Sequence, residues 1–134
     1  MDAYHLLPMS PFWQAKQIIT IDGEHHVDRN LAFGSSASCG IFISFNSLVT
    51  WTAKYEKGLE YLSNYVNDSS GCDLDGTTLL YEPYGKHMPV QQVQLLQLWD
   101  KLGILHKPHK QVFGSPLIII GIEVNPNQMT LTLP

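Results

Sequence analysis

The sequence predicts an α+β domain in which two main helices pack on one face of a mostly antiparallel sheet. Two apolar segments with helical periodicity alternate with three segments that have the composition of β-hairpins. The order hairpin, helix, hairpin, helix, hairpin is typical of helices that gather on one face of an antiparallel sheet. Because the chain contains no internal repeat and no linker-like tract, we expect one domain over residues 1–134.

The first hairpin is expected over residues 17–33. Before it, Pro8 and Pro11 limit the apolar start of the chain to one helical turn followed by an extended segment. Residues 17–21 are rich in β-branched side chains, and the tight-turn dipeptide Asp22-Gly23 follows them. Residues 25–33 can therefore pair back on residues 17–21.

A long buried helix is expected over residues 35–55. Ser35 or Ser36 is suited to be its N-cap, and Gly58 is a stop signal. Its apolar pattern has spacings of three and four and consists of Ile41, Phe42, Phe45, Leu48, Val49 and Thr52.

A second hairpin with a polar tip is expected after that helix. Residues 59–66 have the composition of a strand, and residues 67–71 form a cluster of turn-forming residues. Residues 73–88 contain Gly76, Pro83 and Gly85, so we expect a loop there.

The last third of the chain predicts one helix and a closing hairpin. Residues 90–102 are helix-periodic, with Pro89 suited to the first turn and Gly103 to the C-terminal stop. Residues 116–123 and 129–133 read as two strands joined by an Asn-Pro-Asn-Gln turn.

Composition excludes several classes of protein. With 44% apolar and 15% charged residues, the chain is neither disordered nor a coiled coil. No run of eighteen apolar residues occurs, and no basic segment opens the chain. We therefore expect no membrane partner, no classical secretory signal, and an intracellular location in the cytoplasm or nucleus. The net charge of -4 gives no general attraction to phosphate, so nucleic-acid binding would need a local site or a bound metal.

Two segments are chemically unusual. Residues 64–70 place aromatic, amide and carboxylate side chains at a hairpin tip, and residues 33–42 form a small-residue opening to a long helix. Cys39 and Cys72 are too few for a disulfide scaffold. His25-His26 and the pair His106 and His109 lack the further ligands of a zinc finger, so zinc is not expected.

Five segments, taken in order, carry a family resemblance. The first is Asp2-Ala3-Tyr4 with the apolar-proline stretch that follows it. The second is residues 33–42, which match the pattern F-G-x-x-x-A-P-x-x-F except that Ser38-Cys39 stands at the Ala-Pro position, and the third is Tyr65-Val66-Asn67-Asp68, which matches Y-x-D-D except at Asn67. The last two are Leu102-Gly103-Ile104 with Lys110, and residues 120–125 with 129–134. In this order they resemble the palm of a reverse transcriptase, an RNA-directed DNA polymerase. The last segment is most similar to retrotransposons of the tyrosine-recombinase (DIRS-like) type.

The resemblance implies an incomplete ferredoxin-like palm unit and a set of site residues. Asp68 would be the residual catalytic and metal-binding carboxylate, Asn67 stands at a substituted catalytic position, and Lys110 matches a proton donor to pyrophosphate. The nucleotide-binding positions would be Asp2, Ala3, Tyr4, Phe33, Gly34 and Tyr65. The implied cofactor is Mg²⁺, held in pairs by carboxylates in this chemistry.

The chain departs from the family pattern at two catalytic positions. The metal-binding aspartate of the first motif would lie three residues before Asp2, and Asn67 replaces the first aspartate of Y-x-D-D. We expect Mg²⁺ binding to be weak or absent and the rate of nucleotide addition to fall by a factor on the order of 10³ to 10⁵ or more. The expected protein is thus a retroelement-derived, reverse-transcriptase-like palm domain that is catalytically inactive, with a residual binding role or none.

Three alternatives remain open at this point. The chain could be a nucleic-acid or nucleotide-binding module, with RNA or DNA as its partner. It could instead be a protein-interaction or self-assembly module, because the absent first-motif strand would leave an open edge on the hairpin of residues 59–73 for a homodimer or a strand-donating protein. It could also be a polymerase subunit whose missing aspartate comes from another chain. Each site residue has an ordinary alternative too: Asp68 as a turn residue, Tyr4 and Tyr65 as packing residues, Gly34 as a helix entry and Lys110 as a surface lysine.

Overall fold

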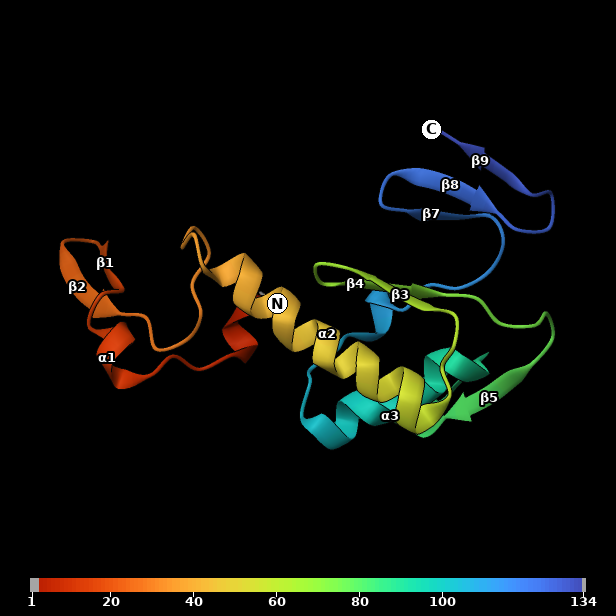
Figure 1. Ribbon diagram of the computed structural model, residues 1–134, viewed down its shortest axis with the longest axis horizontal. Helices are drawn as coiled ribbons and strands as arrows, with labels where there is room; N and C mark the ends of the chain where they lie inside the picture. Colours follow the sequence, from red (N-terminus) through yellow and green to blue (C-terminus); the bar gives the residue numbers. More distant parts are fainter. Residues whose placement is uncertain (1–2, 134) are drawn as a thin grey trace. The chain divides into compact units, whose positions relative to one another are not determined.

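The computed structural model describes residues 3–133 (Figure 1), and the chain consists of two compact units. The first unit runs to Gly58 and includes Ser63–Ser69, and the second comprises Leu59–Leu62 and the chain from Ser70 onward. Helices alternate with short antiparallel strands, which confirms the α+β class. The described strands form four small sheets, so the ferredoxin-like arrangement on one sheet is not confirmed. No helix of residues 3–133 has the length and apolar character needed to cross a bilayer.

The first unit begins with two short helices and a hairpin. The 3-10 helix η1 (Ala3–Leu6) is the expected single turn, whereas α1 (Pro11–Gln14) occupies a segment expected to be extended. Pro11 stands at the first position of α1, where its fixed φ suits a helix. The antiparallel strands β1 (Ile18–Ile21) and β2 (Glu24–Val27) confirm the first hairpin and its Asp22-Gly23 turn, but β2 ends at Val27 and does not reach the expected residue 33.

The long helix α2 (Ser38–Lys57) ends as expected at Gly58, which has φ of 70°. Its start is different: Ala37 is the N-cap, with no side-chain hydrogen bond, so the expectation of Ser35 or Ser36 is wrong. The side-chain bond that holds this entry comes from Ser38, whose hydroxyl donates to the carbonyl of Ala32 at 2.6 Å. One face of α2 is buried and carries Phe42, Val49 and Ala53.

The hairpin of β3 (Leu62–Tyr65) and β4 (Asp68–Gly71) turns earlier than expected. Its two-residue turn consists of Val66 and Asn67, and the four residues after them form a strand instead of a polar tip. A glycine is needed at Gly71, because a Cβ there would lie 2.9 Å from the carbonyl oxygen of Tyr61. This close approach accounts for the glycine at the end of β4.

In the second unit, a hairpin replaces the loop expected over residues 73–88. The strands β5 (Thr78–Tyr81) and β6 (Lys86–Pro89) pair antiparallel, and the 3-10 helix η2 (Glu82–Tyr84) lies in the connection between them. The residues interpreted as loop signals, Pro83 and Gly85, form the connection between the strands, and Gly85 has φ of 59°. The loop expectation was wrong because it treated a hairpin connection as the whole segment.

The helix α3 (Val90–Leu102) is confirmed, and it packs on β5 and β6. Pro89 is its N-cap, and Gly103 ends it with φ of 70°. The core of the unit is a cluster of buried side chains with two half-buried aromatic rings against it; its members are Tyr81, Met88, Val93 and Leu96, with Tyr84 and Trp99.

The chain ends in a three-stranded meander instead of a two-stranded hairpin. After the 3-10 helix η3 (Pro108–Lys110) come β7 (Leu117–Ile119), β8 (Ile122–Asn125) and β9 (Thr130–Thr132), with β8 in the centre. The apolar run that was expected to be one strand is broken by a turn at Ile120 and Gly121, both with positive φ. Because this turn separates β7 from β8, the two short strands pair antiparallel with each other.

Candidate functional site

The centre of the candidate site is an aromatic cluster that joins η1 to the start of α2. The Tyr4 and Phe33 ring centroids lie 4.5 Å apart, and the Phe42 ring centroid lies 5.3 Å from that of Tyr4. Phe42 is buried, Tyr4 is half-buried, and Phe33 remains 60% exposed. The cluster therefore has a fixed base on α2 and an open aromatic face at Phe33.

The Tyr4 hydroxyl is held in its neutral form. A hydrogen bond with the Cys39 side chain, with a smaller contribution from burial, raises the pKa of Tyr4. A phenol in this state carries no charge at neutral pH, and its one O–H is engaged in the bond with Cys39. Tyr4 thus combines a packed ring with a polar group at the edge of the aromatic cluster.

The segment around Phe33 is held in place by backbone geometry. Gly34 has φ of 87°, a left-handed conformation that favours glycine. No atom lies within 4 Å of the point where a Cβ would stand at Gly34, so this position faces open space. The Ser38 bond to the carbonyl of Ala32 holds the other end of the same short segment.

The turn between β3 and β4 is attached to α2 by two side-chain amides. The Asn46 amide donates to the carbonyl of Val66 at 2.7 Å, and the Asn64 amide donates to the hydroxyl of Thr50. These bonds fix the turn that carries the Y-x-D-D resemblance. Its outer residue Asn67 is exposed.

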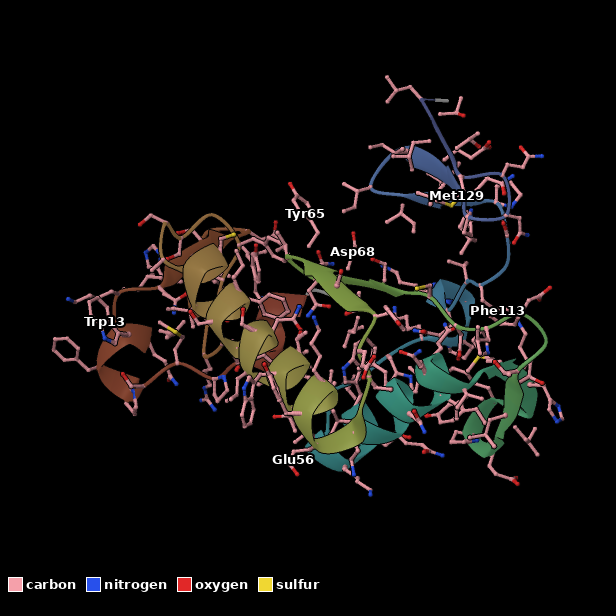
Figure 2. All side chains as sticks on the ribbon, turned by 45° about the vertical axis from the view of Figure 1, so that its right-hand side comes forward. Trp13, Glu56, Tyr65, Asp68, Phe113 and Met129 are labelled. Atoms are coloured by element: carbon pink, nitrogen blue, oxygen red, sulfur yellow. The ribbon has the colours of Figure 1, made fainter. Side chains whose placement is uncertain are left out.

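Tyr65 and Asp68 flank that turn, one on each strand. Tyr65 is 58% exposed and Asp68 is also exposed, and Figure 2 shows both side chains projecting outward from the hairpin. Neither is drawn into a hydrogen bond or ion pair of the described residues. The hairpin therefore presents one aromatic ring and one carboxylate to solvent.

The carboxylates needed for a pair of magnesium ions do not come together in the described part of the chain. Within residues 3–133, no group of three or more His, Cys, Asp and Glu side chains is placed to hold a metal ion. Asp68 offers one carboxylate, and its neighbour Asn67 offers only a neutral amide. The described residues thus do not fit a two-metal centre.

The other sequence-predicted site residues lie in three different settings. Asp2 lies outside the described residues, and Ala3 opens η1. Lys110 is exposed at the end of η3 and belongs to the second unit, whereas Tyr4, Phe33, Gly34, Tyr65, Asn67 and Asp68 all belong to the first.

A polar network in the second unit was not anticipated from the sequence. The Tyr81 hydroxyl donates to Asp100 at 2.6 Å, the His106 Nε2 lies 3.0 Å from the other Asp100 oxygen, and the Tyr84 hydroxyl bonds to His106 Nδ1. The Tyr81 bond, followed by the influence of His106, lowers the pKa of Asp100, while burial and then Asp100 raise the pKa of Tyr81. The four residues are scattered along the sequence, so no local pattern could have indicated them.

That network connects three elements around the core of the second unit. Its members come from β5, η2, the end of α3 and the segment after it, and the His106 side chain is only 8% exposed. Because its groups bond to one another, the network holds the segment after α3 against the hairpin. No family model, curated protein or solved structure matches this chain.

Proposed function

We propose that this chain is a retroelement-derived, reverse-transcriptase-like palm domain that does not add nucleotides and that binds a nucleobase at Tyr4 and Phe33. The observation that carries the proposal is the contact between these two rings, 4.5 Å apart, with Phe33 left 60% exposed. Both positions are ones for which the family resemblance implies contact with a nucleotide.

Stacking supplies the affinity of this site. A base that stacks on an exposed aromatic ring gains about 1–3 kcal/mol, independently of its sequence. The Phe33 ring offers such a face, and the Tyr4 ring packs beside it with its centroid 4.5 Å away. The open space at Gly34 leaves room for the ligand next to the ring.

The charge of the chain limits what else the site can do. With eight basic and twelve acidic residues, the chain has no net attraction for the phosphate backbone. We therefore expect modest affinity and a weak dependence on salt concentration, unlike a protein that holds nucleic acid through many Lys and Arg contacts.

The lack of catalysis follows from the metal chemistry. Nucleotide addition needs two cations about 3.5–4 Å apart, each held by carboxylates. Asp68 is the single family carboxylate in the described hairpin, and an amide at Asn67 does not replace an anionic ligand. Binding without turnover is thus the activity that these residues support, and Mg²⁺ is expected to bind weakly or not at all.

A binding experiment with a matched control tests this proposal. A labelled RNA–DNA hybrid and a deoxynucleoside triphosphate are titrated with the wild type, with Phe33→Ala and with Phe12→Ala. Phe12 is also an exposed aromatic residue, at 69%, but lies in α1. Phe33→Ala should weaken binding by about 5- to 150-fold, the equivalent of 1–3 kcal/mol, and Phe12→Ala by less than about twofold. An absence of binding at low salt, or equal losses in both variants, contradicts the proposal.

Self-assembly through the β3–β4 hairpin is a second candidate function. In the described part of the chain these strands form a sheet of two, so the outer edge of each has no neighbouring strand. Open edges can accept a strand from a second copy or from a partner. Light scattering over a concentration series tests this candidate, and a monomer at every concentration would count against it.

A further inference from the structure

The Phe33 ring has one covered face and one open face. The Tyr4 ring packs over it in a tilted, offset stack, with centroids 4.5 Å apart and an angle of 38° between the ring planes. The His5 ring is farther away, in a T-shaped arrangement with centroids 6.5 Å apart. Because Phe33 is still 60% exposed, the face opposite Tyr4 is the open one. The ring therefore accepts one flat ligand and not two.

The covered face rests on a row of aromatic rings that is anchored in α2. Tyr4 also packs on Phe42, with centroids 5.3 Å apart, and Phe42 is 5% exposed. The Phe45 ring, about one turn further along the helix, lies 6.3 Å from that of Phe42. A ligand on the open face of Phe33 becomes the outermost member of this row, and the rings behind it are already in place before it binds.

The segment that carries the site has no charged side chain. Residues 31–53 contain no Lys, Arg, Asp, Glu or His. Of the two described rings that pack on Phe33, only His5 can become a cation, and its Nε2 lies 3.4 Å from Oδ2 of Asp28. A protonated His5 is therefore balanced by the Asp28 carboxylate. These groups offer no free positive charge to a phosphate, which is the main source of affinity for a nucleic-acid backbone.

The strength of stacking decides which bases this face can reach. Stacking of a base on an aromatic ring raises affinity by about 5- to 150-fold. Inside a duplex, both faces of every base are covered by neighbouring bases, and flipping one base out lowers affinity by a factor on the order of 10² to 10³. Proteins that open a duplex offset this cost through further contacts to the bent backbone, and residues 31–53 have no cation for such contacts. A base in the interior of a duplex is therefore not bound.

We propose that the Tyr4 and Phe33 site binds one nucleobase through an uncovered face and makes no contact with phosphate. Its ligands are free nucleosides and nucleotides, whose bases have both faces uncovered, and the terminal or unpaired bases of a strand. An RNA–DNA hybrid then binds through its ends. The inference rests on the proposed function, because it names the class of ligand for the same site.

A series of adenine ligands tests whether phosphate takes part in binding. Adenosine, AMP and ATP are titrated into the isotope-labelled full chain, and the shifts of the backbone amide signals give each dissociation constant. The three constants should agree within about twofold, because the phosphates add no contact. Phe33→Ala should weaken all three by at least about fivefold, and Phe12→Ala, the matched control in α1, by less than about twofold. Binding of ATP that is tighter than that of adenosine by more than this margin overturns the proposal.

A set of labelled RNA–DNA hybrids tests whether only uncovered bases are bound. Two hybrids have the same end sequences, and one is twice as long as the other. Their association constants per hybrid molecule, measured by anisotropy at low salt, should be equal because both have two ends. A third hybrid carries a run of unpaired adenosines at one end and should bind more tightly, because each unpaired base adds a site. An association constant that rises in proportion to duplex length, or that does not rise with the unpaired run, overturns the proposal.

These outcomes separate the inference from the proposed function. If no adenine ligand binds, or if Phe33→Ala binds as the wild type does, both the inference and the proposed function fail. If adenosine binding depends on Phe33 but ATP or the longer hybrid binds more tightly, nucleobase binding stands and the restriction to uncovered bases without phosphate contact is overturned. Circular dichroism of Phe33→Ala and the wild type separates lost binding from lost folding.

Discussion

Truncation of Leu96 to alanine should cost much of the stability of the second unit. Leu96 is 1% exposed and lies in one cluster with Tyr81, Met88 and Val93. Removing its buried side chain loses the transfer free energy of the deleted groups and leaves a cavity, and such changes cost about 2–5 kcal/mol. Small domains have a free energy of unfolding of about 5–15 kcal/mol, so the loss is large.

Leu102→Ala is the matched control on the same helix. Leu102 is 50% exposed, so its truncation loses about half of the transfer term, roughly 1 kcal/mol, and leaves no enclosed cavity. Helix propensity changes by the same small amount at both positions and cancels in the comparison. Urea unfolding followed by circular dichroism, at a protein concentration below any association, measures both variants. A cost for Leu96→Ala no greater than that for Leu102→Ala would refute the description of this core.

Three further predictions follow from the polar contacts. Asn46→Ala removes the bond to the carbonyl of Val66 and should destabilise the hairpin turn by about 0.5–1.5 kcal/mol, seen as faster amide exchange in β3 and β4 but not in β5 and β6. The hydrogen bond from Tyr81 lowers the pKa of Asp100 in the folded state. The Asp100 carboxylate therefore contributes to the free energy of unfolding above about pH 4, and this contribution is lost as the pH falls through the folded pKa. Urea unfolding at a series of pH values should show this loss in the wild type and not in Asp100→Asn. Asn67→Asp should leave primer extension undetectable, since residues 3–133 hold no group of three or more side chains placed to bind a metal ion, and one added carboxylate at the turn does not make a two-metal centre; measurable extension would contradict this.

The elements that sequence predicted well are those with strong local end signals. The Asp22-Gly23 turn fixed the first hairpin, and Gly58 and Gly103 gave the ends of α2 and α3, because positive φ makes glycine nearly obligatory there. These signals are local, so no tertiary context was needed to interpret them.

The misses occurred where tertiary context decides. In residues 73–88 and 116–133 the turn residues lie between paired strands, and only the pairing of those strands shows that such residues connect two strands instead of marking a loop. The N-terminus of α2 was misplaced for a related reason. No serine caps the helix from outside; the hydroxyl of Ser38, inside the helix, donates a hydrogen bond to the carbonyl of Ala32.

For the site, the sequence motifs named residues but not their partners. The contact of Tyr4 with Phe33 joins positions 29 residues apart. The Phe42 ring and the Cys39 side chain, which also contact Tyr4, are likewise far from it in the sequence. The network around Asp100 had no motif at all, since its geometry depends on how α3 meets the β5–β6 hairpin.

Anisotropy of a labelled RNA–DNA hybrid, titrated at low salt with and without Mg²⁺, tests the central claim most directly. A site built from the Tyr4 and Phe33 rings, without paired carboxylates, should bind the hybrid equally in both conditions. Binding that appears only when Mg²⁺ is added, or no binding in either condition, would contradict it.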